Sequence, residues 1–341
     1  MNTPIKTYSL NGLKNLCAEL GLPRFRSDQI ASWLYLKSSK SYDDMTNLSK
    51  ELRMTLRESH PLYGPEVIDK QISQDGTQKY LSRLYDGALI ETVLIPTGLG
   101  KYSVCCSTQA GCPMACSFCA TGKAGFTRNL SVGEIVDQVN LGREDAEFRI
   151  SSVVFMGQGE PLLNYENTIE ALHILNHPKL LNIGARHLTI STCGIIPGIL
   201  NLAQEPEQFT LAVSLHSVRQ ELRNDLMPTL KNYPLVALKG ALSTYIDQTN
   251  RRVSFEYALM RGVNDQKEDL EALLSFCQGL LCHVNLIPLN QTDYSRYQPS
   301  TPETMNYWAD RINASGISAT IRKSKGSDID GACGQLANKA K

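Results

Sequence analysis

The chain of 341 residues is long enough for one large α/β domain with a small accessory unit. Its 42% apolar residues are typical of a globular enzyme, and its formal net charge of zero gives no sign of a nucleic-acid partner, so any RNA binding must come from local basic patches. No apolar run approaches the roughly 20 residues of a membrane span, and the N-terminus lacks the apolar core of a signal peptide. We therefore expect a cytoplasmic protein without a membrane partner.

Residues 1–62 are predicted to form short helices that make a small accessory domain. Ile30, Trp33 and Leu34 share one helical face, and Leu52 and Leu56 share another. The segment is locally basic through the following side chains: Arg24, Arg26, Lys37, Lys40, Lys50, Arg53 and Arg57. A solvated helical surface and an RNA-binding domain explain this pattern equally well.

Residues 63–100 change to a pattern of strands. Residues 78–85 and 88–95 are predicted as two strands, because Asp86-Gly87 between them is a strong signal for a hairpin turn. Apolar residues line both faces of the second strand, so Glu91 is a carboxylate in a strand that otherwise reads as buried. Either Glu91 lies at an edge and reaches solvent, or it is a pocket carboxylate that takes part in proton transfer.

Residues 101–322 alternate between strand-like and helix-like segments. The strands are predicted at residues 102–107, 152–156, 187–191, 210–215, 252–258 and 282–287. Helices fall between them, and the first begins with a capping box formed by Ser131 and Glu134. Six βα units in a row predict an α/β fold whose parallel sheet is either curled into a partial (βα)6 TIM-like barrel or doubly wound. In both arrangements ligands bind at the carboxyl ends of the strands.

Polar loops follow several of these strands at the edge where a ligand is expected. Residues 157–161 read GQGEP, a backbone that can approach a ligand closely, and Glu160 suits an ammonium group through charge-assisted hydrogen bonding. An ordinary strand-to-helix turn explains the same residues. Further polar residues at strand ends are Ser191, Ser214, His216 and Asn290. A local hydrogen bond explains each of these equally well.

The loop after the first of the six strands carries three closely spaced cysteines. Residues 111–122 read GCPMACSFCATG, which places Cys112, Cys116 and Cys119 at C-x3-C-x2-C spacing. Three such thiolates suit three corners of an iron–sulfur cluster and leave one iron open to a substrate. A zinc site needs a fourth ligand, and the fifty residues after Cys119 contain no cysteine or histidine. A zinc site completed by a distant residue, or buried cysteines without metal, would explain the same spacing.

The remaining cysteines divide into core residues and one residue near the C-terminus. Ten cysteines in a chain without a predicted export signal favour metal and thiol chemistry over a disulfide framework. Three are predicted to be small core residues, namely Cys193, Cys277 and Cys282. In the tail of residues 323–341, Cys333 stands between small residues, which predicts an exposed, flexible turn. Nearby cations lower the pKa of a thiol, and three precede it: Arg322, Lys323 and Lys325.

Motifs at separate places along the chain together resemble one family of enzymes. They are QAGC at 109–112, FCATG at 118–122, TRNLS at 127–131, SLH at 214–216 and DIDGACGQL at 328–336. The cysteine loop and the Gly159-Glu160-Pro161 motif resemble the radical S-adenosylmethionine (radical SAM) superfamily. The full set, in this order, resembles the RlmN/Cfr family of RNA adenine methyltransferases, and most closely its RlmN branch. The resemblance runs from the N-terminal helices to Leu336, nearly the whole chain.

The resemblance implies a role for each matching residue. Cys112, Cys116 and Cys119 match the ligands of a [4Fe–4S] cluster. The residues that match SAM-binding positions are Gly159, Glu160, Ser191, Ser214, Leu215, His216 and Asn290. Cys333 matches a cysteine that is itself methylated, Cys105 the cysteine that resolves it, and Glu91 the proton acceptor. By spacing Cys105 is the match rather than Cys106, and thiols of neighbouring strand residues point to opposite faces. Gln158 departs from the family, which commonly has methionine there.

The resemblance also implies the reaction and its partners. Family members of the RlmN type methylate C2 of an adenosine in 23S rRNA and of an adenosine beside the tRNA anticodon, and an external electron donor drives the reaction. TRNL at 127–130 and RKSKG at 322–326 favour this branch over C8 methylation of 23S rRNA, as in the Cfr branch. The sequence is also compatible with radical chemistry on a small molecule or protein, and with a non-catalytic metal-dependent RNA-binding protein. A monomer is expected.

Overall fold

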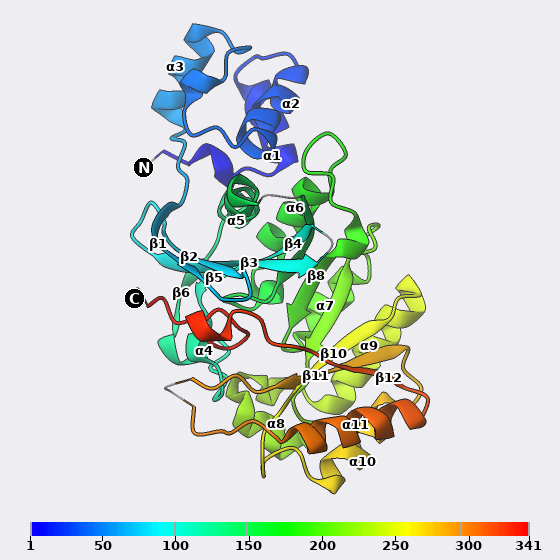
Figure 1. Cartoon of the computed structure of the whole chain (residues 1–341). Coiled ribbons are helices and arrows are strands. Elements are labelled where there is room, and N and C mark those ends of the chain that lie inside the picture. Colours follow the sequence, from blue (N-terminus) through cyan, green and yellow to red (C-terminus); the bar gives the residue numbers. More distant parts are fainter. Residues whose placement is uncertain (1, 99, 147–148, 293–294, 340–341) are drawn as a thin grey trace.

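The computed structural model describes residues 2–98, 100–146, 149–292 and 295–339. A helical unit lies at one end, a large sheet flanked by helices forms the body, and the C-terminal segment returns across the body toward α4 (Figure 1). No helix within these described residues is long and apolar enough to cross a membrane.

The N-terminal unit consists of short helices that pack against the body of the protein. Its elements are η1 (Ile5–Thr7), α1 (Leu10–Glu19), α2 (Phe25–Ala31), the π-helical η2 (Ser32–Leu36), η3 (Tyr42–Asp44) and α3 (Lys50–Ser59). Lys6 and Asp137 form a buried ion pair with a distance of 2.8 Å between Nζ and Oδ1. Breaking such a pair by removing one partner leaves a buried charge, so the pair attaches this unit firmly to α5 (Val132–Asp145).

A ten-stranded sheet forms the centre of the molecule, and its spatial order follows the chain. The strands are β1 (Glu66–Ile72), β2 (Gln78–Arg83), β3 (Leu89–Gly98), β4 (Lys101–Cys105), β7 (Ile150–Phe155), β8 (Leu188–Thr192), β9 (Thr210–Ser214), β10 (Val253–Leu259), β11 (Cys282–Pro288) and β12 (Ser318–Ile321). The predicted hairpin is confirmed, because β2 and β3 pair antiparallel. From β4 onward every pairing is parallel.

The strand order decides between the two predicted arrangements of the parallel sheet. In a doubly wound sheet the order reverses at a switch point, whereas here β4, β7, β8, β9, β10, β11 and β12 lie in unbroken sequence. The partial barrel is therefore confirmed. All six predicted strands are present within one or two residues of their expected ends. The short, largely exposed β12 adds a seventh parallel strand that the sequence did not predict.

Helices follow the parallel strands and cover the sheet. They are α5, α6 (Tyr165–Asn176), η4 (Pro161–Leu163), η5 (Ala185–His187), α7 (Ile196–Leu202), α8 (Gln220–Leu226), η6 (Pro228–Asn232), α9 (Leu235–Thr249), α10 (Lys267–Cys277) and α11 (Pro302–Ala314). The predicted capping box of Ser131 and Glu134 begins α5. A two-stranded ribbon of β5 (Gln109–Gly111) and β6 (Phe126–Asn129) encloses the three-cysteine loop and α4 (Ala120–Ala124).

The C-terminal tail is packed onto the body, so the prediction of an exposed, flexible turn is wrong. After η7 (Ser327–Ile329) the tail buries Ala332 and Leu336. The Ala120 N–H donates to the Gly334 carbonyl at 2.8 Å, and the Thr121 hydroxyl donates to the Leu336 carbonyl at 2.7 Å. Small residues let the tail backbone approach α4 closely, which sequence composition alone does not distinguish from mobility.

Candidate active site

The three-cysteine loop is shaped by close backbone contacts. Gly111 has a φ of +75°, and a Cβ atom there would lie 2.1 Å from the Gly125 carbonyl oxygen. The Cys112 N–H donates to the same oxygen at 2.7 Å. Cys119 ends the loop as the N-cap residue of α4. Backbone interactions thus fix the loop. Its three thiols are free and form no disulfide.

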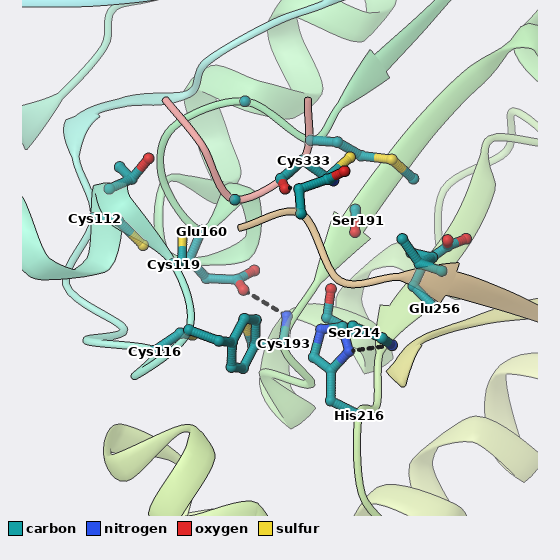
Figure 2. A pocket seen from close by; sticks show the side chains of 18 of the residues that line it. Cys112, Cys116, Cys119, Glu160, Ser191, Cys193, Ser214, His216, Glu256 and Cys333 are labelled. Carbon is teal, nitrogen blue, oxygen red and sulfur yellow. Dashed lines mark hydrogen bonds between the residues drawn. The ribbon is translucent and has the colours of Figure 1, made fainter. Parts of the chain in front are cut away.

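Cys112, Cys116 and Cys119 line one open cavity of about 150 Å³, here called the strand-end cavity (Figure 2). Thiolates on a tetrahedral zinc ion lie roughly 3.8 Å apart. Among the described residues, these three sulfur atoms do not form a set within 4.8 Å of one another. The arrangement is too open for zinc and fits a larger cluster. Burial raises the pKa of Cys112 and Cys119, so a metal must displace their protons on binding.

Glu160 is a buried carboxylate that lines this cavity. Its Oε2 accepts from the Cys193 N–H at 2.7 Å, and its Oε1 accepts from the Leu162 N–H at 3.0 Å. Burial raises the pKa of Glu160, and the hydrogen bond from Cys193 opposes that shift. Gly159 before it has a φ of +103°, in a turn that packs against Gln109. A carboxylate can accept about four hydrogen bonds, so Glu160 retains the capacity to accept from a ligand ammonium group.

The other strand-end residues surround the same cavity, with one exception. Ser191, Ser214, His216 and Asn290 all line it. The His216 ring is fixed, because its Nδ1 accepts from the Ala258 N–H at 3.0 Å and Phe118 packs edge-on against it. Burial, followed by the charge of Arg223, lowers the pKa of His216 to about 3, so the ring is neutral. Leu215 is fully buried and does not line the cavity.

Cys333 lies between the strand-end cavity and a second cavity, here called the tail cavity. The tail cavity is lined by Cys105 and Leu336, and its basic residues are Arg322, Lys323 and Lys325. Cys333 lines both cavities, and its carbonyl accepts from the Asn290 amide at 3.1 Å. Burial and then the Cys333 thiol raise the pKa of Cys105 to about 12, an effect that the Arg322 charge opposes. Cys105 and Cys333 thus line the same cavity.

Cys105 and Cys106 face opposite sides of the sheet. Cys105 packs with Val93 and Leu336 on the tail side, whereas Cys106 belongs to the main core. Only Cys105 lines the tail cavity. This is the arrangement expected for neighbouring residues at the end of a strand.

Glu91 is fully buried, so the possibility of an edge residue that reaches solvent is wrong. Its Oε1 lies 3.1 Å from the Lys79 Nζ, and its Oε2 accepts from the Asn338 N–H at 2.9 Å. Glu91 lines neither of the two cavities. The end of the tail therefore covers this carboxylate.

Comparisons with known proteins agree with this geometry. The Radical SAM superfamily model matches residues 106–277, and the model described as the ribosomal RNA large subunit methyltransferase N-terminal domain matches residues 5–61. The chain is 44% identical over 333 residues to a probable dual-specificity RNA methyltransferase RlmN of Clostridium novyi, with 97% of each chain covered. It is 45% identical over 340 residues to the protein of the same name in Bacillus thuringiensis subsp. konkukian, covering 99% of this chain and 94% of the relative.

The chain belongs to the RlmN family of radical SAM enzymes. A crystal structure of a radical SAM methyltransferase from Sphaerobacter thermophilus is similar to it, with a TM-score of 0.92 and 43% sequence identity. That similarity covers 99% of this chain and 100% of the other. The protein is thus a methyltransferase, and its cofactors are a [4Fe–4S] cluster and SAM.

Gln158, the position that departs from the RlmN family pattern, contacts the tail and not the strand-end cavity. Its Nε2 donates to the Asn338 Oδ1 at 2.7 Å, and its Oε1 accepts from the Glu91 N–H at 3.3 Å. Its side chain is buried. Gln158 therefore links the Glu91 backbone to Asn338, the residue that covers the Glu91 carboxylate.

Cys193 is a site residue that sequence reasoning missed. Its sequence context predicts a core residue, as for Cys277 and Cys282, but it lines the strand-end cavity with the three loop cysteines. Its place directly after β8, at the edge where ligands bind, is the signal that points to the cavity.

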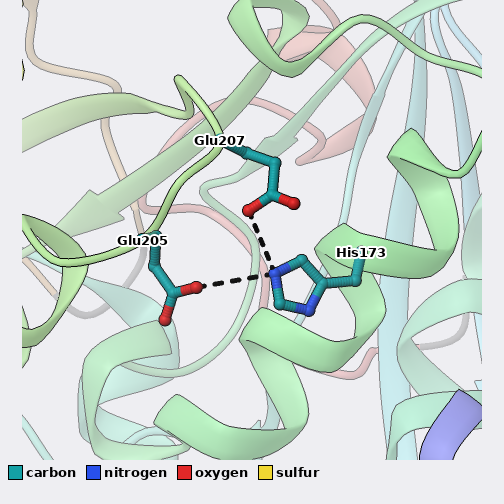
Figure 3. Close-up of side chains that lie close together, drawn as sticks. All are labelled: His173, Glu205 and Glu207. Atoms are coloured by element: carbon teal, nitrogen blue, oxygen red, sulfur yellow. Dashed lines mark ion pairs between the residues drawn. The ribbon is translucent and has the colours of Figure 1, made fainter.

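A separate group of potential ligands lies away from the RlmN-type site. The His173 Nε2 is 3.5 Å from a Glu205 carboxylate oxygen and 3.3 Å from one of Glu207 (Figure 3). Tyr165 donates to Glu205 at 2.9 Å, and the His173 ring contacts Phe209. All three side chains of the group are partly exposed, and none lines either cavity.

Proposed function

We propose that this enzyme methylates C2 of an adenosine in RNA and that Cys333 carries the methyl group. The observation that carries the proposal is the position of Cys333, which lines both the strand-end cavity and the tail cavity. A carrier needs access to a methyl donor on one side and to an acceptor on the other. The basic residues of the tail cavity suit the phosphates of RNA.

In this proposal the strand-end cavity holds both cofactors. Cys112, Cys116 and Cys119 bind three irons of the cluster. SAM is held by the backbone of Gly159 and Leu215 and by the side chains of Glu160, Ser191, Ser214, His216 and Asn290. When bound, the cluster supplies the electron that cleaves SAM to give a 5′-deoxyadenosyl radical. The open space beside buried Glu160 supports this assignment.

The residues of the tail cavity perform the steps on the methyl group. The Cys333 thiolate attacks the methyl of one SAM molecule; a C–S bond forms and S-adenosylhomocysteine leaves. The S-methyl group gives a hydrogen atom to the 5′-deoxyadenosyl radical, its carbon bonds to C2 of adenine, and the adduct gives back the one electron that SAM cleavage consumed. Glu91 takes the C2 proton. Cys105 then attacks the Cys333 sulfur, the carbon–sulfur bond breaks as the disulfide forms, and the released carbon takes up a proton to become the methyl group of the RNA. An external electron donor then reduces the disulfide.

We further propose that 23S rRNA and tRNA are the substrates. The name of the relatives, dual-specificity RNA methyltransferase, supports two RNA substrates. In this assignment residues 1–62 bind RNA, residues 63–100 supply Glu91, residues 101–322 form the radical SAM barrel, and residues 323–341 deliver Cys333. Several basic side chains of the first segment are exposed, including Arg24, Lys37 and Lys50. The enzyme then acts as a monomer in the cytoplasm, where both RNAs are found.

The test is a product analysis with the anaerobically reconstituted enzyme, SAM, a reductant, and a 23S rRNA fragment or tRNA. The RNA is digested to nucleosides and methyladenosine isomers are separated by mass spectrometry. We expect C2-methyladenosine from the wild type and none from Cys333→Ala. C8-methyladenosine would keep the carrier chemistry and contradict the C2 assignment. No methylated adenosine from either RNA, with an intact cluster, would contradict the proposed function.

A further inference from the structure

Glu256 is a buried carboxylate in the strand-end cavity to which neither the sequence motifs nor the family resemblance gives a role. It lies on β10 and lines the cavity, and only 4% of its surface is exposed. The parallel register pairs it with Ser214 of β9, at the spacing of about 4.8 Å that separates neighbouring strands. Residues paired in this way point to the same face of a sheet. Glu256 therefore lies beside Ser214, which is a proposed SAM-binding residue.

One oxygen of this carboxylate is held by the strands beside it. The Glu256 Oε1 accepts from the Asn285 Nδ2 at 2.9 Å and from the Ser254 hydroxyl at 3.2 Å. The Asn285 Oδ1 in turn accepts from the Thr320 hydroxyl at 2.6 Å. These three partners do not line the cavity. They orient the carboxylate from behind, and supporting hydrogen bonds of this kind fix the geometry of a binding group.

The other oxygen of the carboxylate has no hydrogen-bond donor within the described part of the chain. The Glu256 Oε2 is shielded from solvent, and the Arg322 Nη1, with which it forms an ion pair, lies 3.8 Å away. That separation is too long for a hydrogen bond. A buried carboxylate oxygen without a donor is unfavourable, so a donor supplied by a ligand in the cavity stabilises it. The carboxylate therefore indicates a ligand that carries a hydroxyl or amino group.

The position of Glu256 selects the part of SAM that supplies this donor. Figure 2 shows the three loop cysteines and Glu160 at one end of the labelled side chains and Glu256 at the other. In the proposed function the open iron and Glu160 bind the methionine part of SAM, so the nucleoside part extends toward β10. An ionised carboxylate can only accept hydrogen bonds. The hydroxyl groups of ribose are the donors that a carboxylate binds in dinucleotide sites.

We propose that Glu256 binds the ribose hydroxyl groups of SAM through Oε2 and so fixes the nucleoside in the strand-end cavity. The proposal rests on the proposed assignment of this cavity to SAM. The ribose carries C5′, the carbon on which the radical forms, so a hydrogen bond to the ribose restricts where that carbon lies. A carboxylate that only balances the charge of Arg322 has no such preference for the ribose hydroxyl groups.

The test combines a change in the residue with a change in the ligand, as in a double-mutant cycle. S-adenosylhomocysteine is the probe, because it has the nucleoside of SAM and no methyl group to transfer to Cys333. Its binding and that of its 2′-deoxy and 3′-deoxy analogues are measured by equilibrium dialysis with the anaerobically reconstituted wild type and Glu256→Gln. We expect Glu256→Gln to bind S-adenosylhomocysteine about tenfold more weakly, because a hydrogen bond to a charged group is lost.

The analogues decide whether that loss comes from the ribose. At least one deoxy analogue should bind the wild type about tenfold more weakly than S-adenosylhomocysteine does. The same analogue should bind Glu256→Gln as tightly as S-adenosylhomocysteine does, because the contact is already absent. Glu205→Gln is the matched control, since its carboxylate accepts from Tyr165 and lies outside both cavities. It should match the wild type with every ligand.

Three results would overturn the proposal. Independent losses from Glu256→Gln and from the deoxy analogues would show that Glu256 acts only through Arg322. Full affinity of the wild type for both deoxy analogues would exclude the ribose contact, whether or not any variant folds. Coupling to S-inosylhomocysteine alone, which lacks the adenine amino group, would assign Glu256 to adenine. Each of these leaves the proposed function standing, whereas failure of the wild type to bind either SAM or S-adenosylhomocysteine would contradict both.

Discussion

The strand-end cavity and the tail cavity differ in how far their residues are already arranged for the proposed reaction. In the first, every side chain expected to bind SAM stands at the end of a strand or on a loop fixed by backbone hydrogen bonds, and the space is open. In the second, Cys105 and Cys333 line one cavity, but Glu91 is fully buried and the Asn338 backbone covers its carboxylate. The proposed SAM site is therefore preformed, whereas the proposed proton transfer to Glu91 requires the end of the tail to move.

The largest expected effect concerns the strand-end cavity alone. Cys119→Ala removes a proposed cluster ligand, so iron content and visible absorbance of the anaerobically purified protein should fall to background. No methylated adenosine should form. Cys282→Ser is the control, because its thiol lies outside the cavity, and it should retain the cluster. A full cluster in Cys119→Ala would show that Cys119 is not a cluster ligand.

A second change separates attachment of RNA from its release. Cys105→Ala leaves the strand-end cavity intact but removes the thiol that we propose resolves the adduct. We expect less than one turnover and a covalent RNA–protein species that migrates slowly on a denaturing gel. The double variant Cys105→Ala/Cys333→Ala should not form this species. Normal turnover by Cys105→Ala would show that another group releases the product.

The fixed ring of His216 makes the strand-end cavity sensitive to acid. Its pKa is lowered to about 3 in the folded protein by burial, whereas the unfolded chain has a histidine pKa of about 6.5. Below pH 6.5 the unfolded chain therefore binds a proton that the folded protein does not, and stability falls as the pH drops toward 3. Between pH 7 and pH 5 the loss is about 2 kcal/mol.

Urea unfolding at pH 7 and pH 5 checks this expectation. His216→Asn retains a side chain that can accept from Ala258 but does not titrate, so its stability should fall less between the two pH values. The difference from the wild type should be close to the 2 kcal/mol given above. The same pH dependence in both proteins would show that His216 is not the group responsible.

The smallest expected effect concerns the cover over Glu91. Gln158→Met removes the hydrogen bonds to Asn338 and to the Glu91 backbone. The free energy of unfolding should fall by about 1 kcal/mol, and amide hydrogen exchange of residues 336–339 should become faster. SAM binding should not change, because Gln158 does not line the strand-end cavity. Gln204→Met, which loses an exposed hydrogen bond to Gln248, is the matched control.

The sequence predicted the strand-end cavity better than the tail cavity, for a physical reason. The six predicted strands are short segments rich in apolar residues, and the ligand edge of a parallel sheet follows directly from the positions where those segments end. The cover over Glu91 depends on contacts between residues about 250 positions apart, such as Asn338 and Glu91. No local pattern reports them.

The same absence of a local pattern explains why the surroundings of Cys333 and Cys193 were predicted wrongly. Small residues around Cys333 indicate mobility as readily as close packing, and only the neighbouring α4 decides between them. Cys193 has the ordinary surroundings of a core cysteine in the sequence. It lines the strand-end cavity because the end of β8 and the cysteine loop meet in space.

The attachment of the tail to α4 links maturation of the cofactor site to delivery of the methyl carrier. Ala120 and Thr121, which hold the tail at Gly334 and Leu336, directly follow the proposed ligand Cys119. Disorder of the cysteine loop would therefore weaken the hydrogen bonds that hold the tail segment around Cys333. If Cys333 is the methyl carrier, only a chain whose cysteine loop is ordered presents it at the cavity.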